Sequence, residues 1–217
     1  KHLTSLIKYA DFGISDVKSV PANIPSDIWH QFKEQMKTQI GADEGKLEEA
    51  FNIKNATQLQ FTHTGEDSSS AGFGLDNESR GTVAALSFFS LALRQLSRPT
   101  VTLIDEIDTS LHPALVAELV ALYTDPATNP HGSQLIFTTH DVSLINQSGS
   151  SNRLLQPDQI WLVEKDKDGA SELFPVTELG IRKEENIGKN YLNGVYGATS
   201  NPSFHTVFAQ IMNGDDD

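Results

Sequence analysis

Two acidic residues and one histidine stand where buried strands would end. Asp105 and Glu106 follow the apolar run Val101–Ile104, and His140 follows a second apolar run, 135–137, after two threonines. Such runs suit strands of a parallel sheet, whose ligands bind at the carboxyl ends of the strands. There Asp105 can hold a hydrated Mg²⁺, Glu106 can orient the water that attacks a γ-phosphate, and His140 can donate a hydrogen bond to that phosphate. We predict half of an ATP-hydrolysing site; the alternative is a solvated strand end without function.

A second group of candidate residues, Ser79, Arg80 and Gly81, opens a helix-like stretch, 83–96. Ser79 offers a hydroxyl, and the start of a helix offers free N–H groups and the positive end of its dipole to a phosphate. Gly81 permits close approach of the backbone, and an arginine such as Arg80 also suits phosphate. The alternative is an ordinary helix cap. The order and spacing of the motifs favour phosphate binding.

These motifs resemble those of the ABC-type ATPase superfamily. Asp105 and Glu106 resemble the Walker B end, the segment 109–112 resembles the D-loop, and His140 resembles the switch histidine. The family's signature is usually Leu-Ser-Gly-Gly-Gln, of which this chain matches the serine and the second glycine. The resemblance implies ATP and Mg²⁺ as cofactors, bound at a head-to-tail dimer. It implies catalytic roles for Glu106 and His140, a metal ligand in Asp105, and nucleotide contacts from Ser79, Arg80, Gly81 and Ser110.

A closer resemblance covers most of the chain, because further segments follow in the same order: 9–16, 134–141, 158–165, 182–186 and 191–198. The chain resembles the C-terminal half of bacterial AAA-type, ABC-like ATPases of anti-phage defence, related to the SMC and OLD ATPases. The resemblance implies an ATPase that gates an effector, such as a nuclease or a toxin. Two alternatives remain open: an SMC-like ATPase of DNA repair or recombination, and a nucleotide-sensing scaffold that holds a toxin or nuclease without turnover.

A phosphate-cradling P-loop is the part of the ATP site that this sequence lacks. The motif needs Gly-x-x-x-x-Gly-Lys followed by Ser or Thr, because its backbone wraps the phosphates and its hydroxyl binds Mg²⁺. The nearest match, 41–47, is one spacer short, has acidic residues in the loop, and ends on Leu47 where a hydroxyl belongs. The chain also begins at Lys1. We therefore expect an incomplete ATPase whose N-terminal half, with Walker A, is a partner of this segment.

Composition restricts the remaining classes. The chain has 217 residues with 38% hydrophobic content, enough for one sizeable core and a second small subdomain. Its net charge of −13 argues against a nucleic-acid groove in this segment, because phosphate binding needs clustered Lys and Arg. It has no cysteine and no apolar run approaching the roughly 18 residues of a membrane span. We expect a cytoplasmic protein that contacts neither nucleic acid through this segment nor a membrane.

The elements that must position these residues are predicted to form an α/β fold. We expect a layered P-loop NTPase lobe of ABC-ATPase type with a mainly parallel sheet, incomplete, plus a small helical insertion. Residues 57–217 would form the C-terminal part of this domain. Its expected elements are a strand over 57–63 with His63 as an ordinary strand residue, a loop over 65–72, helices over 82–97 and 113–123, strands over 101–104 and 134–138, a short helix from Val142, a hairpin of 160–164 with 172–175, and a packed turn over 191–198 that closes the C-terminus.

Residues 1–56 would be the end of a lid or insertion with an amphipathic helix. The helix is expected from an N-cap at Ser26 to Ile40, with one apolar face formed by Ile28, Trp29, Phe32, Met36 and Ile40. Core packing is the default interpretation of that face, and a lid or a partner surface is the alternative.

Overall fold

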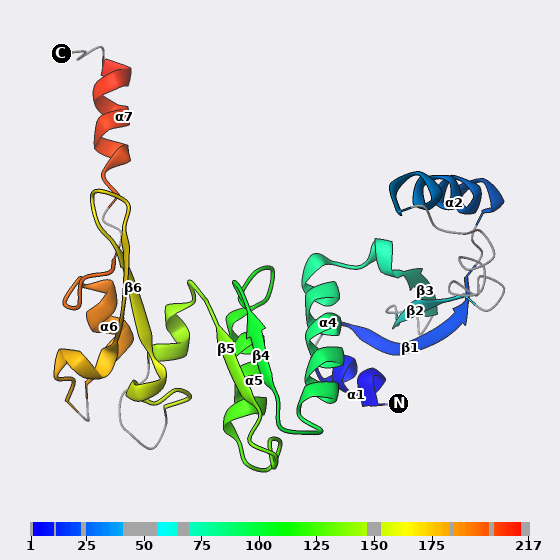
Figure 1. Ribbon diagram of the computed structural model, residues 1–217, viewed down its shortest axis with the longest axis horizontal. Helices are drawn as coiled ribbons and strands as arrows, with labels where there is room; N and C mark the ends of the chain where they lie inside the picture. The colour runs from blue at the N-terminus through cyan, green and yellow to red at the C-terminus, as the bar shows by residue number, and fades with distance from the viewer. Residues whose placement is uncertain are drawn as a thin grey trace. The chain divides into compact units, whose positions relative to one another are not determined.

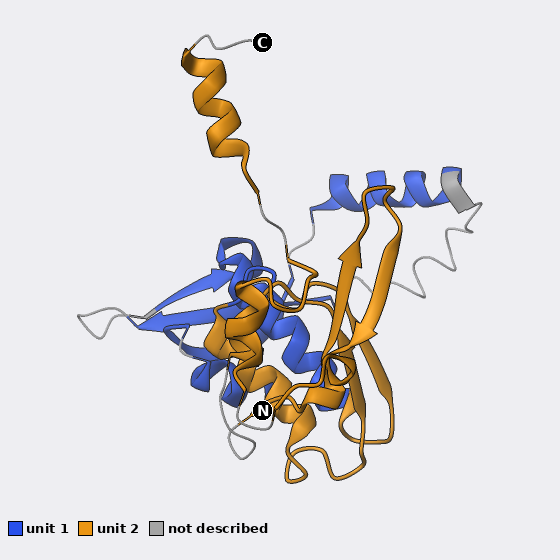
Figure 2. Ribbon diagram, turned by 90° about the vertical axis from the view of Figure 1, so that its left-hand side faces the viewer, with its two compact units in different colours: residues 1–94, 109–111 blue, residues 95–108, 112–217 orange. Residues whose placement is uncertain are grey.

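The structure is a computed structural model of residues 1–217. It describes residues 2–10, 12–22, 25–40, 56–64, 70–146, 153–182, 185–199 and 202–213. The chain forms two compact units (Figures 1 and 2): Lys1–Arg94 with Thr109–Leu111, and Gln95–Asp108 with His112–Asp217. The near-match to a P-loop at 41–47 lies outside the described residues.

The first unit is built on a three-stranded antiparallel sheet of order β1-β2-β3. Phe61 at the centre of β2 is fully buried, and Ile7 and Ile14 join it in the core. The register pairs Phe61 with Val17 on one side and Phe73 on the other. The elements of this unit are α1(His2–Tyr9), β1(Ile14–Pro21), α2(Ser26–Ile40), β2(Thr57–Thr64), β3(Ser70–Gly74), η2(Leu75–Asn77) and α4(Arg80–Gln95).

Helix α2 forms where the sequence predicts it, but its apolar face does not enter a core. None of its described side chains is buried, and Ile28 is 55% exposed. Trp29 stacks on Phe32 with ring centroids 5.4 Å apart. For the described side chains of this face, the core-packing interpretation is therefore wrong. The expected cap is also one residue off, since the helix includes Ser26 and the Pro25 carbonyl accepts its first hydrogen bond, from the Trp29 N–H.

The second unit contains a parallel pair of strands, β4(Val101–Ile104) and β5(Gln134–Phe137), joined through α5(Pro113–Thr124). His112 begins α5 as its N-cap, because its Nδ1 accepts from the Ala114 N–H at 3.2 Å and Pro113 needs no partner for a missing N–H. The helix buries Val116, Leu119, Val120 and Tyr123. The strands and helix predicted here are confirmed to within a residue.

The second unit also contains the predicted antiparallel hairpin, formed by β6(Trp161–Lys165) and β7(Ser171–Pro175). Its core joins Ile160, Leu162, Val176, Ile187 and Tyr196. The other elements are η3(Val142–Ile145), η4(Pro157–Gln159), η5(Val176–Leu179), α6(Ile187–Leu192) and α7(Phe204–Asn213). None of the helices in the described ranges is both long and apolar enough to cross a membrane.

The structure corrects three expectations, two about the sheets and one about the 191–198 turn. The predicted mainly parallel sheet is wrong for the described residues, where only β4 and β5 pair in parallel and the other two sheets are antiparallel. Residues 70–72, predicted as loop, belong to β3. The 191–198 turn is packed, because the Tyr191 hydroxyl donates to the Ala198 carbonyl at 3.0 Å, yet it does not close the chain because α7 follows.

The expected domain boundary, between residues 56 and 57, falls between β1 and β2. These two strands pair along seven residue positions, from Ile14 with His63 to Pro21 with Thr57. Both sides of that boundary therefore contribute strands to one sheet of the first unit.

Candidate functional site

The carboxyl ends of β4 and β5 bring the predicted catalytic residues to one sheet edge. Ile104 pairs with Phe137, so the residues that follow both strands leave the sheet together. Asp105 and Glu106 follow β4, and His140 lies three positions beyond β5. All three side chains are exposed. Reactive groups are thus accessible at the edge where parallel sheets bind their ligands.

Thr138 connects the two strand ends, and the sequence did not single it out. Its hydroxyl donates to Asp105 Oδ1 and accepts from the Glu106 N–H at 2.8 Å. Its backbone N–H donates to the Ile104 carbonyl at 3.1 Å, and its carbonyl accepts from the Ile107 N–H at 3.0 Å. One residue therefore fixes the Asp105 carboxylate and the backbone of Glu106. Its place as the first residue after an apolar run was the signal available in the sequence.

Glu106 has a backbone conformation that is rare for its residue type. Its φ is +50°, in the left-handed region, where a residue with a Cβ atom is strained. Ser110 shares this property with a φ of +65°. Strained backbone concentrates at functional sites when the surroundings hold it in place. Here the hydrogen bond from the Glu106 N–H to Thr138 is one such restraint.

Asp108 holds the segment that carries His140. Asp108 Oδ1 accepts from the Thr139 hydroxyl at 2.7 Å and from the His140 N–H at 3.3 Å. Burial pushes the pKa of Asp108 upward. The two hydrogen bonds just described, a further hydrogen bond from the Asp108 backbone, and the nearby His140 imidazole together outweigh burial, so the pKa lies below its ordinary value. The ionised carboxylate is therefore the form that fits this place. Asp108 was not among the predicted site residues.

The site suits a magnesium ion that is coordinated both by the protein and by the phosphates of a nucleotide. Mg²⁺ in phosphate-transfer sites takes one or two carboxylates and completes its shell with water and phosphate oxygens. Asp105 supplies one exposed carboxylate of this kind. Among the described residues no three His, Asp or Glu side chains converge on a metal position. The single carboxylate of Asp105 is a donor of the kind that would bind Mg²⁺ together with phosphate oxygens.

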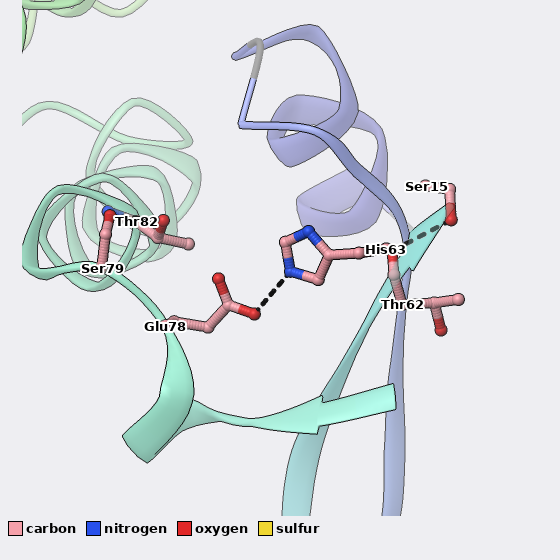
Figure 3. A network of polar contacts seen from close by, with 6 residues as sticks. All are labelled: Ser15, Thr62, His63, Glu78, Ser79 and Thr82. Atoms are coloured by element: carbon pink, nitrogen blue, oxygen red, sulfur yellow. Dashed lines mark hydrogen bonds and ion pairs between the residues drawn. The ribbon is translucent and has the colours of Figure 1, made fainter. Parts of the chain in front are cut away.

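The predicted nucleotide contacts Ser79, Arg80, Gly81 and Ser110 lie in the first unit. Ser79 caps α4, because its Oγ accepts from the Thr82 N–H at 3.0 Å and lies 2.9 Å from the Thr82 hydroxyl oxygen (Figure 3). The cap that appeared as the alternative interpretation is thus present. Ser79, Arg80 and Ser110 are also exposed, so their polar groups remain accessible to a ligand.

Gly81 and Ser110 come from different predicted motifs and lie in contact. A Cβ atom added at Gly81 would come within 2.7 Å of the Ser110 carbonyl oxygen. The structure thus joins the signature-like and D-loop-like segments inside the first unit. Asp105, Glu106 and His140 form a separate group in the second unit.

Comparison with known proteins assigns the family. No curated protein matches the chain. A family model described as "AAA domain, putative AbiEii toxin, Type IV TA system" matches residues 11–146. The match spans more than half of the chain and contains both groups of candidate residues. The chain therefore belongs to this AAA-domain family of P-loop ATPases.

Proposed function

We propose that this chain supplies the hydrolytic part of an ATP site. Asp105 would hold Mg²⁺, Glu106 would orient the attacking water, and His140 would donate to the γ-phosphate. The observation that carries the proposal is the double hydrogen bond of Thr138, which sets the Asp105 carboxylate and the Glu106 backbone at one sheet edge. Positioning of this kind is most of what phosphoryl transfer asks of a protein.

A P-loop from another segment would complete the site. Parallel sheets are normally covered on both faces, and each of their strands is a continuous apolar run in the sequence. In this chain Val101, Leu103 and Ile136 of the parallel pair are 57%, 73% and 57% exposed. This uncovered apolar face supports an incomplete lobe. A segment carrying the phosphate cradle would cover it and add strands to the sheet.

The signature-like segment would act on the nucleotide of a second subunit. Ser79 and the opening of α4 offer hydrogen-bond donors and a positive dipole end but no carboxylate for metal or water. Such a group can bind a phosphate that another site holds with its magnesium. ATP would then join two heads in a head-to-tail dimer, and hydrolysis would release them.

The cycle of joining and release would gate an effector in anti-phage defence. Support comes from the family description, which names a putative toxin and a toxin–antitoxin system. A protein effector such as a toxin or nuclease fits this segment better than direct DNA binding, because its net charge is −13. A scaffold that senses nucleotide without hydrolysis would instead show tight ATP binding with no turnover.

Calorimetric titration with Mg-ATP tests the incomplete site. This chain alone is expected to show no binding in the micromolar range, while the same chain accompanied by a P-loop segment binds. A tight stoichiometric site on this chain alone would contradict the proposal.

The dimer is tested by mixing variants of the P-loop-containing protein, which is this chain together with the segment that carries the P-loop. Ser79→Arg should block ATP-dependent dimerisation while monomers still bind ATP, and Ser79→Thr, which keeps the helix cap, is the control. Mixing Ser79→Arg with a Walker A-defective protein should restore part of the ATPase activity, because one composite site carries neither lesion. Loss of ATP binding by Ser79→Arg monomers would place Ser79 in its own subunit's pocket.

A further inference from the structure

A histidine and a glutamate form a partly buried contact directly before the signature-like segment (Figure 3). His63 Nε2 lies 2.8 Å from Glu78 Oε1. The Glu78 side chain is only 5% exposed, and that of His63 is 32% exposed. The ring of Phe73 packs edge-on against the imidazole, with centroids 5.4 Å apart and planes at 72°. The imidazole is therefore held in place and supplies the Glu78 carboxylate with a hydrogen-bond donor.

The contact ties the start of α4 to the centre of the antiparallel sheet. His63 belongs to β2 and pairs with Ile14 in β1 and Ala71 in β3. Glu78 immediately precedes Ser79, the cap of α4. A buried carboxylate is costly without a donor, so losing His63 would drive Glu78 outward. Any such movement occurs one residue from Ser79.

An outward-turned Glu78 would compete with phosphate. A carboxylate just before a helix is attracted to the free N–H groups and the positive dipole end, which are the groups a phosphate would use. Glu78 also bears the same sign of charge as the phosphate. In the structure the carboxylate lies against His63 instead, on the sheet (Figure 3).

We infer that His63 is a positioning residue that holds the Glu78 carboxylate on the sheet and so keeps the start of α4 available to the phosphates of ATP. The inference rests on the proposed function and adds a residue that acts on the signature-like segment through Glu78. This role goes beyond the expectation that His63 is an ordinary strand residue.

The test compares variants of similar size in the P-loop-containing protein. His63→Leu removes the donor, while His63→Gln keeps an N–H donor. His63→Leu is expected to raise the KM for ATP roughly tenfold, the effect of one hydrogen bond to a charged group, with a smaller change in kcat. His63→Gln should stay closer to wild type. His30→Ala, on the exposed helix α2, is the control for a histidine elsewhere in the unit.

A double variant separates positioning from stability. His63→Leu/Glu78→Gln removes the competing charge and should return the KM to within about twofold of wild type, and thermal unfolding of the single and double variants shows how far stability changes alongside. If the double variant is as impaired as His63→Leu, or if His63→Leu leaves the KM unchanged, the inference is overturned. Should His63→Leu fail to fold, Glu78→Ala gives the second measurement: a KM near wild type supports the inference, and a tenfold rise overturns it. Absence of ATP turnover in the wild-type protein would instead defeat the proposed function itself.

Discussion

Gly81 lies against the backbone of Ser110, so closely that a Cβ atom at position 81 would come within 2.7 Å of the Ser110 carbonyl oxygen. This contact gives a steric reason for glycine at position 81. Ser110 is itself held at a φ of +65°, which turns its carbonyl in a direction that few residues with a side chain adopt. The signature-like and D-loop-like segments are thus closely fitted to each other.

Gly81→Ala is therefore expected to destabilise the protein, although helix propensity alone favours alanine by about 0.5–1 kcal/mol. Crowding against a backbone atom should cost about 1–3 kcal/mol, because neither partner can rotate away. Chemical denaturation measures the change. Ser87→Ala, at an exposed position of the same helix, is the control and should be nearly neutral. A Gly81→Ala protein as stable as wild type would show that the contact is loose.

The positive φ of Glu106 gives a second stability prediction. Glu106→Gly and Glu106→Ala both remove the carboxylate, so their difference reports the backbone. Glycine should be more stable than alanine there by about 1 kcal/mol, because it adopts the left-handed region without strain. At Asp105, whose φ is not positive, alanine should be the more stable of the two. If alanine were more stable than glycine at position 106 as well as at position 105, strain at Glu106 would be ruled out.

The lowered pKa of Asp108 predicts a pH dependence of folding. A carboxyl group with a lower pKa in the folded state contributes stability above its unfolded pKa and loses it as the pH falls through the folded pKa. The contribution should be complete near neutral pH and disappear as the pH falls below about 4. Asp108→Asn should therefore be less stable than wild type at pH 7, with a difference that shrinks on acidification. Urea denaturation at several pH values measures it, and a difference that grows toward low pH would contradict the assignment.

Local patterns in the sequence predicted the elements around the site well. Val101–Ile104 and the helix from Pro113 are defined by short-range features, an apolar run and an N-terminal proline, and both form as expected. Pairing between distant strands is not a local property, which is why the antiparallel sheet of β1, β2 and β3 was not foreseen. Helix α7 was not predicted either, although it follows the 191–198 turn in the second unit.

The candidate site was only partly predictable for the same reason. Asp105, Glu106 and His140 were found because reactive residue types followed apolar runs. Thr138 escaped notice because its role depends on the parallel register, which brings its hydroxyl to Asp105 and to the Glu106 N–H. Asp108 likewise acts through Thr139 and His140, which lie far away in the sequence.

ATP turnover by Glu106→Gln is the most direct test of the proposed hydrolytic site. In the protein that includes a P-loop segment, this variant should keep ATP binding and lose roughly 10²- to 10⁴-fold in turnover, the usual effect of removing a positioned base. His140→Ala should behave similarly, whereas Asp105→Ala should weaken Mg²⁺-dependent binding. Binding and single-turnover hydrolysis are measured on the same preparations. Wild-type turnover by Glu106→Gln would contradict the account, because Glu106 would then have no part in activating the attacking water.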